Sequence, residues 1–340
     1  MSNNLTYAKS GVNIRSADKF VKFISKISSK QNKNKGQSNI GSFGSISKIP
    51  SHLRNVHIVA STDGVGTKIE IANELNKFDS IGIDLVAMSV NDILVQGGKP
   101  FLFLDYISIN KISQKKLKDI LKGILNGCKI SDCELVGGET AEMPDTYTKG
   151  KFDIAGFCIG LVEKKKILKQ KNIKQNDLII GIPSSGLHSN GFSLVRYILK
   201  KKNINFKKNN KLKKWFLQPT KIYVKEITKL IDLNLINGCA HITGGGIKDN
   251  LSRIIPKGKS AVINLNKIKT KKVFSWLKNN NLSDKEMLKT FNCGVGFILV
   301  IKKKNFNKIK KFFNKKYEPY IIGKIIKGNP KVILNGKINW

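Results

Sequence analysis

Several kinds of residue and motif are scarce in this chain of 340 residues. The five cysteines form no CxxC pair, which argues against a zinc ribbon or a disulfide framework and favours a reducing compartment. No apolar run approaches the roughly 20 residues that a membrane-spanning helix needs. The first residues, MSNNLTYAKSG, lack the basic and then apolar pattern of a secretion leader. We therefore expect a cytoplasmic protein without a membrane partner.

Acidic residues are also scarce, since Asp and Glu number 23 against 62 Lys and Arg, giving a formal net charge of +39. Such a charge attracts phosphate polymers without sequence preference. The lysines are scattered along the whole chain, however, and basic and aromatic residues do not interleave as they do in nucleic-acid modules. A solvated basic surface is therefore the favoured interpretation, and a specific nucleic-acid binder is the less favoured one.

The length exceeds what one hydrophobic core usually supports, so two domains are expected. A polar and basic stretch, KKKILKQKNIKQND, follows a predicted strand over 152–163 and places the boundary near residue 170. The predicted domains are thus 1–170 and 171–340.

Strand-like and helical patterns alternate through both halves. Buried strands are predicted over 55–62 and 99–109, with a helix over 81–97 between them. In the second half LIIGIP, CGVGFILVI, YIIGKII and KVILNG read as strands, and FSLVRYILKK reads as an amphipathic helix. The polar stretch 25–48 is predicted to be a mobile loop. The overall pattern indicates an α/β protein.

The first strand stops at Ser61 and leads into STDGVGTK, a stretch suited to a phosphate ligand. Gly64 and Gly66 allow the backbone to approach a ligand closely. Asp63 can hold a divalent cation, and Lys68 can neutralise a phosphate oxygen. An ordinary strand-ending turn is the alternative, because Asp-Gly is common in turns.

The predicted helix over 81–97 is apolar nearly all round, but Asp84, Asn91 and Asp92 interrupt it on one face. Buried carboxylates need partners, and the stretch from Ile81 to Gly98 contains no Lys or Arg. A Mg²⁺ ion bridging carboxylates and phosphates would satisfy them. Basic side chains from elsewhere, or backbone hydrogen bonds for Asn91, are the alternatives.

Three further glycine-containing stretches carry polar side chains. GGETAEMPDTY holds Glu139 and Glu142, which could add metal ligands or orient an amine. SSGLHSNG places His188 just ahead of a helix, where it could move a proton or donate to a phosphate. The three glycines of HITGGG form either a phosphate cradle or a tight turn. Cys293, in TFNCGVG, is more consistent with a buried thiol than a reactive one.

Eight stretches, in order and spanning nearly the whole chain, resemble the phosphoribosylformylglycinamidine cyclo-ligase family, also called the AIR synthase family. They are STDGVGTK, GIDLVAMSVNDILVQGGKPFLFLDY, LVGGETAEMP, AGFCIGLVE, SSGLHSNGFSLVR, PTKIYV, HITGGG and TFNCGVG. The resemblance implies a two-domain α/β fold, with an N-terminal domain that contributes to a β-barrel shared across a homodimer. The C-terminal domain would pack helices on a larger sheet.

The resemblance also implies a reaction and a site. ATP phosphorylates the formyl oxygen of formylglycinamidine ribonucleotide, a substrate nitrogen attacks that carbon, and loss of phosphate closes the imidazole ring in purine synthesis. The implied catalytic residues are Lys68, Asp92 and His188, and the implied Mg²⁺ ligands are Asp63, Asp92 and, more weakly, Glu139. The implied ATP and phosphate contacts are Asp63, Gly64, Gly66, Thr67, Lys68, Asn91, Gly244, Gly245 and Gly246.

The sequence departs from the family pattern at a few places. In DILVQGGKP, Gly98 replaces the usual Ala, and Lys99 stands where an acid is usual. The family's functional lysine in the N-terminal loop has no secure register here, because both Lys26 and Lys30 are candidates. Thiamin-monophosphate kinase, a member of the same superfamily, is the main alternative. Selenophosphate synthetase is disfavoured because no Cys precedes Cys128.

Overall fold

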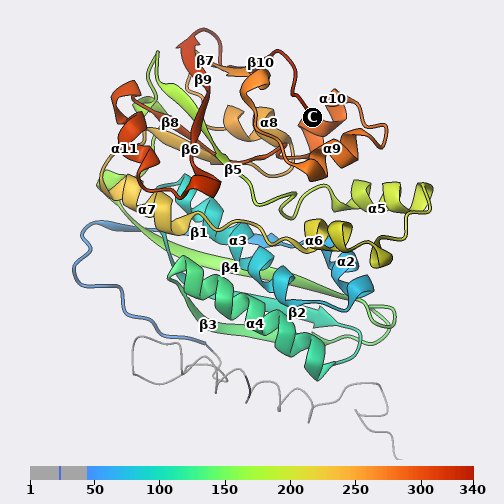
Figure 1. Cartoon of the computed structure of the whole chain (residues 1–340). Helices are drawn as coiled ribbons and strands as arrows, with labels where there is room; N and C mark the ends of the chain where they lie inside the picture. Colours follow the sequence, from blue (N-terminus) through green and yellow to red (C-terminus); the bar gives the residue numbers. More distant parts are fainter. Residues whose placement is uncertain (1–22, 24–43) are drawn as a thin grey trace, which may run out of the picture.

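The computed structural model describes residues 23 and 44–340, so Lys26, Lys30 and nearly all of the predicted loop over 25–48 lie outside the described residues. Two β-sheets lie one above the other, with helix α3 between them (Figure 1). Strands of the first sheet come from residues 56–163, and strands of the second from residues 178–335. The exact domain boundary stays a prediction.

The first sheet has four strands in the order β1-β4-β2-β3. The β4 strand is antiparallel to both neighbours, whereas β2 and β3 run parallel. Helices α3 and α4 pack on one face of the sheet, and α2 follows the turn after β1. The elements are β1 (Val56–Gly64), α2 (Lys68–Leu75), α3 (Asp79–Val95), β2 (Lys99–Ile109), α4 (Gln114–Ser131), β3 (Glu134–Glu142) and β4 (Phe152–Glu163).

The second sheet has six strands in the order β10-β7-β9-β5-β8-β6, with helices on both sides. Its strands are β5 (Leu178–Pro183), β6 (Gly238–His241), β7 (Lys259–Asn264), β8 (Val295–Ile301), β9 (Tyr320–Lys327) and β10 (Lys331–Asn335). Its helices are α5 (Phe192–Lys201), α6 (Asn210–Leu217), α7 (Val224–Asp232), α8 (Gly246–Ser252), α9 (Lys272–Lys278), α10 (Asp284–Thr290) and α11 (Phe306–Lys310). Short 3₁₀ turns occur at Lys164–Lys166, Gln170–Asn172, Phe206–Lys208, Leu265–Lys267, Lys303–Asn305 and Lys315–Tyr317.

The predicted element types are confirmed at most positions, but the burial predicted for the strands over 55–62 and 99–109 is wrong. In β2 Tyr106 is 36% exposed, and Leu102 and Leu104 are only half-buried. Four apolar residues of α5, spaced for one helix face, are buried as expected: Phe192, Val195, Ile198 and Leu199. The strand predicted over 55–62 exists as β1, but it is not buried on both faces, since Ile58 is 69% exposed. Helices cover only one face of this sheet among the described residues, so alternate side chains of β1 point away from the core.

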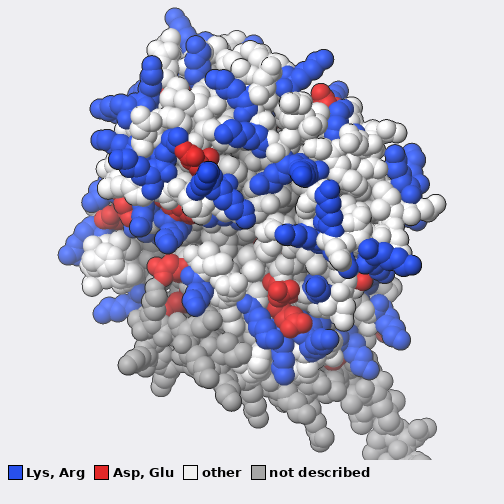
Figure 2. Space-filling model, viewed as in Figure 1, with Lys and Arg blue, Asp and Glu red and all other residues white. Residues whose placement is uncertain are grey.

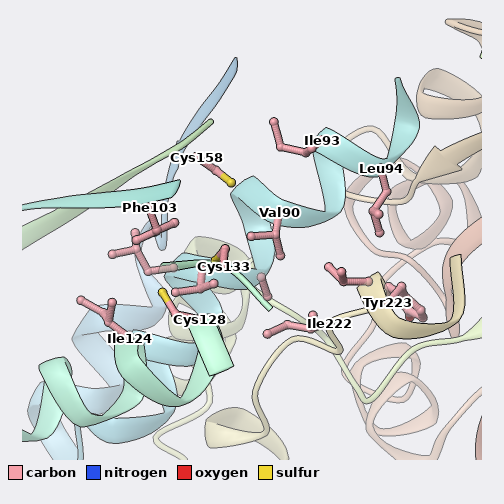
Figure 3. Packing of buried hydrophobic residues seen from close by; sticks show 14 of the residues in the cluster. Val90, Ile93, Leu94, Phe103, Ile124, Cys128, Cys133, Cys158, Ile222 and Tyr223 are labelled. Carbon is pink, nitrogen blue, oxygen red and sulfur yellow. The ribbon is translucent and has the colours of Figure 1, made fainter. Parts of the chain in front are cut away.

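One hydrophobic core links the two halves of the chain. Val90 and Leu94 of α3 pack with Ile222 and Tyr223, which precede α7 (Figure 3). On the other side of α3 the same core reaches Cys128 of α4, Cys133 between α4 and β3, and Cys158 of β4. All five cysteines of the chain are free and buried, including Cys293 as predicted. The functional side chains of α3 are therefore held between both halves.

On the face drawn in Figure 2, Lys and Arg side chains of the described residues are spread widely rather than gathered in one patch. This distribution agrees with the interpretation of a solvated basic surface. A search of the described residues finds no helix with both the length and the apolar character needed to cross a membrane.

Candidate active site

The turn after β1 carries the first carboxylate of the site. Asp63 is partly buried, and its Oδ1 accepts a hydrogen bond from the backbone N–H of Gly64 at 2.8 Å. Gly66 has a φ of +66° with open space around it, so a side chain there would be strained by the backbone rather than by a clash. Thr67 is exposed, and its hydroxyl lies 2.9 Å from that of Ser193 at the start of α5. The turn is thus exposed at Gly66 and Thr67 and is held at both ends by hydrogen bonds.

Helix α3 supplies a second carboxylate beside the first. Asp92 has a side chain that is 46% exposed, and its Oδ1 lies 2.9 Å from Nδ1 of His241 at the end of β6. Burial raises the pKa of Asp63, the hydrogen bond from Gly64 opposes that shift, and the nearby negative charge of Asp92 adds to it. Two carboxylates and one imidazole, brought from β1, α3 and β6, therefore lie close together.

Asn91, which was predicted to contact the nucleotide, is instead fully buried against the backbone of the second half. Its amide nitrogen donates to the carbonyl of Lys221 at 2.9 Å, and its Oδ1 accepts from the N–H of Tyr223 at 3.0 Å. The alternative of backbone hydrogen bonds for Asn91 is thus the one that the structure shows. Asn91 docks the segment that leads into α7.

Lys68, which was predicted to neutralise a phosphate, is also completely buried. Its Nζ lies 2.6 Å from Oδ2 of Asp84 and donates to the carbonyls of Gln218 at 2.8 Å and His188 at 3.2 Å. Burial lowers the pKa of Lys68, and the charge of Asp84 partly offsets that effect. Three protein oxygens surround this ammonium group inside the core, so it is not open to a phosphate. Asp84 is likewise satisfied by Lys68 rather than by a metal.

His188 lies in the loop between β5 and α5, at a φ of +64°, and is 1% exposed. Its Nε2 accepts from the N–H of Ser185 at 3.2 Å, which places the ring proton on Nδ1. Nδ1 is buried without a hydrogen-bond partner in the part of the chain that the structure describes. Burial first, and then the nearby positive charges, lower the pKa of His188 well below its usual value. The ring is therefore neutral, and its predicted role in moving a proton stays a prediction.

The glycine stretch after β6 is a tight turn into α8. The buried side chain of Asn250 donates to the carbonyls of Gly244 at 3.1 Å and Gly246 at 2.8 Å, which fixes the turn. A Cβ on Gly246 would lie 2.0 Å from the carbonyl of Leu288, so this glycine is required for close packing on α10. Gly244 is exposed and faces Asn190 of the His188 loop. Only Gly244 and Gly245 are thus exposed enough to meet a phosphate.

Glu139, predicted as a weaker Mg²⁺ ligand, does not lie with Asp63 and Asp92. Asp63 pairs across the sheet with Gly156, and Gly156 pairs with Asp105, so these three residues point to the helix-covered face. Glu139 pairs with Tyr106 and therefore points to the opposite face, where it is exposed. Among the described residues no group of three or more His, Cys, Asp or Glu side chains is placed to hold a metal.

The sequence interpretation missed His241 as a site residue, although it stands in the quoted HITGGG stretch. Its ring is 4% exposed, contacts Asp92 and lies 6.1 Å from the ring of Phe297 of β8. Its position after a short apolar strand and before three glycines was the available signal. Asp105 was also missed, and its pKa is raised to about 7, mainly by burial.

Comparison with known proteins bears on these observations. Residues 51–162 match the model of the AIR synthase related protein N-terminal domain, and residues 174–335 match that of the corresponding C-terminal domain. A phosphoribosylformylglycinamidine cyclo-ligase of Thermodesulfovibrio yellowstonii is 45% identical over 334 residues, which cover 96% of this chain and 97% of that protein. The chain belongs to the AIR synthase family. It is thus a member of an enzyme family, and the family resemblance drawn from its motifs is confirmed.

Solved structures of other members of the AIR synthase fold are more distant. Thiamine-monophosphate kinase from Stenotrophomonas maltophilia has a TM-score of 0.70 and 14% identity, covering 94% of this chain and 96% of that one. The hydrogenase maturation protein HypE in complex with ATP has a TM-score of 0.64 and 13% identity, covering 88% of this chain and 86% of that one. At these identities the likeness shows the fold alone, so it does not favour the kinase activity over that of the family.

Proposed function

We propose that this chain catalyses the ATP-dependent ring closure of formylglycinamidine ribonucleotide to 5-aminoimidazole ribonucleotide, with release of ADP and phosphate. The observation that carries the proposal is the 45% identity to a cyclo-ligase over nearly the full length of both chains. The ligands are the ribonucleotide substrate and ATP, and no specific nucleic acid is proposed. The free, buried state of all five cysteines supports a reducing location such as the cytoplasm.

Asp63 and Asp92 are the proposed holders of Mg²⁺–ATP. Mg²⁺ binds proteins through one or two carboxylates together with substrate phosphates, so a pair of accessible carboxylates fits it without a third acid. When bound, Mg²⁺ neutralises charge on the phosphates during transfer to the formyl oxygen. The turn is exposed at Gly66 and Thr67, so these residues can bring backbone N–H groups to the same phosphates, whereas the N–H of Gly64 donates to Asp63.

Two histidines have separate proposed parts. His241 holds the Asp92 carboxylate in one orientation through the contact between Nδ1 and Oδ1 at 2.9 Å. His188 remains a neutral ring that shapes its loop, and the same loop carries Asn190 towards Gly244. An amide oxygen must become phosphate before a nitrogen can displace it, so this loop would orient the substrate while the carboxylates position ATP.

A homodimer with a shared barrel is proposed for the uncovered face of the first sheet. Three large side chains on that face are exposed: Ile58 to 69%, Phe157 to 44% and Tyr106 to 36%. Leu102, Leu104 and Ile159 lie beside them in the register of β2 and β4. A contiguous apolar surface of this kind is typical of a protein–protein interface, and a second copy of the same strands would cover it symmetrically.

The proposed reaction is tested by ADP release from ATP on addition of formylglycinamidine ribonucleotide, with thiamin monophosphate as the control substrate. We expect Asp92→Asn to lower kcat by about 10²–10³-fold, because one charge that positions the phosphates is removed. Asp232→Asn is the matched control, since Asp232 is 45% exposed against 46% for Asp92, and each contacts one basic side chain at 2.9 Å.

Asp232 lies on the surface with Lys99, so its variant should retain wild-type turnover. Turnover by Asp92→Asn within about twofold of wild type would remove Asp92 from the site. ADP release with thiamin monophosphate but not with the ribonucleotide would overturn the proposed reaction itself.

A further inference from the structure

Helix α2 contributes a fully buried ammonium group to a network that joins the two halves of the chain. Lys68 and Asp84 both belong to the first half, and both side chains are 0% exposed. Asp84 Oδ1 accepts from the N–H and the hydroxyl of Thr220, each at 2.7 Å. Lys68 donates to the carbonyls of Gln218 and His188. The ion pair therefore binds two separate segments of the second half.

These two segments are also bonded to each other. The hydroxyl of Ser185 donates to the carbonyl of Pro219 at 2.6 Å, and the hydroxyls of Ser189 and Thr220 lie 3.2 Å apart. Both ends of the loop 184–191 are thus attached to residues 218–220. Lys68 is the group that attaches the middle of this loop, at His188, to the half of the chain that carries Asp63 and Asp92.

We propose that Lys68, neutralised by Asp84, is a positioning residue that sets the loop 184–191 relative to the two carboxylates. The inference rests on the proposed function and identifies a residue that acts on the reaction without touching ATP. His188 has a backbone φ of +64°, a conformation that is uncommon for an L-residue and is stabilised by neighbouring contacts. Lys68 supplies such a contact from the opposite half of the molecule.

The physical consequence concerns geometry rather than affinity. Loss of the two hydrogen bonds from Nζ would free the loop to shift, and displacements of about 1 Å at a reacting centre can lower a rate by roughly 10²-fold. The hydrogen bonds and ion pair of Lys68 Nζ are to His188, Gln218 and Asp84, and none of them is to Asp63, Asp92 or His241. ATP affinity should therefore change little while turnover falls.

Lys68→Met alone would leave Asp84 as an unpaired buried carboxylate and could prevent folding. The informative variant is therefore Lys68→Met combined with Asp84→Asn, which removes both charges, keeps the side-chain volumes and preserves an acceptor for Thr220. The matched control is Lys221→Met with Glu226→Gln. That ion pair, at 2.9 Å with side chains 17% and 13% exposed, lies near the same segment but makes no contact with the loop.

The experiment measures four quantities on full-length protein: melting temperature, kcat, the KM for ATP, and amide hydrogen exchange without substrates. For the Lys68→Met/Asp84→Asn variant we expect a melting temperature within about 5 °C of wild type. We also expect kcat to fall at least about tenfold, with the KM for ATP within about twofold. Amide hydrogen exchange should accelerate at residues 184–191 and stay unchanged in β8. The control pair should leave kcat and exchange in the loop as in wild type.

If the melting temperature and the kcat of the double variant both equalled those of wild type, the pair would be only structural and the proposal would be overturned. A raised KM for ATP with unchanged kcat would also overturn it, because Lys68 would then contact the nucleotide. Absence of ring closure in the wild-type protein would instead count against the proposed function, and the hydrogen-exchange result would still decide the positioning role.

Discussion

Strands β8 and β1 show how differently the two sheets are covered. All seven residues of β8 are buried, whereas none of the nine residues of β1 is fully buried. Helices pack on both faces of the six-stranded sheet, and among the described elements α3 and α4 cover only one face of the four-stranded sheet. Described elements therefore cover both faces of the second sheet, whereas the apolar side chains on one face of the first sheet are left exposed by the described residues, as expected for the proposed interface.

The site uses this difference. Asp63 and Asp92 lie where the covered face of the first sheet meets α3 and the end of β6. His241, from the second sheet, contacts Asp92 on the side of the first sheet that the helices cover. Burial by the second half fixes Asn91 and Lys68, and the exposed turn beside them keeps a carboxylate available. The first half supplies both acids of the proposed site, and the second half contributes the contacts that hold α3 and the start of α2 in place.

The largest expected effect comes from a charge on the uncovered face. Phe157→Arg would place a cation beside Thr62 and Leu104, its cross-strand neighbours in β1 and β2. A symmetric interface contains each substitution twice, and an unpaired buried charge costs about 3–5 kcal/mol, so the dissociation constant should rise by roughly 10⁴-fold or more.

Light scattering coupled to size exclusion would measure this change as a dimer that becomes a monomer. Tyr197→Arg is the control, because Tyr197 is an isolated side chain, 59% exposed, on α5. A wild-type monomer, or a Phe157→Arg dimer, would show that the uncovered face has another role.

The second expected effect compares equivalent truncations in the two sheets. Leu299→Ala in β8 should lower the free energy of unfolding by about 2–5 kcal/mol, because Leu299 is completely buried. Leu104→Ala on the uncovered face of β2 should cost less than about 1.5 kcal/mol in dilute protein, where copies are apart. Urea unfolding would measure both values, and equal losses would contradict the difference in coverage.

How far the sequence predicts this molecule depends on how local each signal is. The apolar spacing of α5 and the run of β8 lie within single elements, so both were predicted with nearly correct bounds. The prediction that Asp63 and Asp92 belong to the site rests on the same kind of signal, since each stands in a distinctive local stretch. Their proximity in space agrees with that interpretation.

Predictions that depended on tertiary partners were less successful. Asp84 needed a cation, but no basic residue precedes it on its own helix, and the partner Lys68 comes from α2. Glu139 was predicted to lie with Asp63, but in the strand pairing it is Gly138 that shares a row with Asp105 and Asp63. Because successive residues of a strand point to opposite faces, Glu139 points away from Asp63. Strand register and ion pairs between elements are set by the assembled fold, so neither could be read from local pattern.

The smallest expected effect concerns Asp105, on the covered face of the first sheet. Burial raises its pKa from 3.8 to about 7, with the nearby charge of Glu139 as a smaller cause. Between these two values the folded protein keeps a proton that the unfolded chain has lost, so stability falls as the pH rises from about 4 to about 7. A shift of this size corresponds to at most about 4 kcal/mol.

Asp105→Asn removes the titrating group, so its free energy of unfolding relative to wild type should rise by about 1–4 kcal/mol over that pH interval and then stay level. Asp153→Asn, the same substitution at an exposed position of β4, is the matched control. If the difference between Asp105→Asn and wild type did not change with pH, the covered face would be as hydrated as the uncovered one, and the contrast between the two faces would be lost.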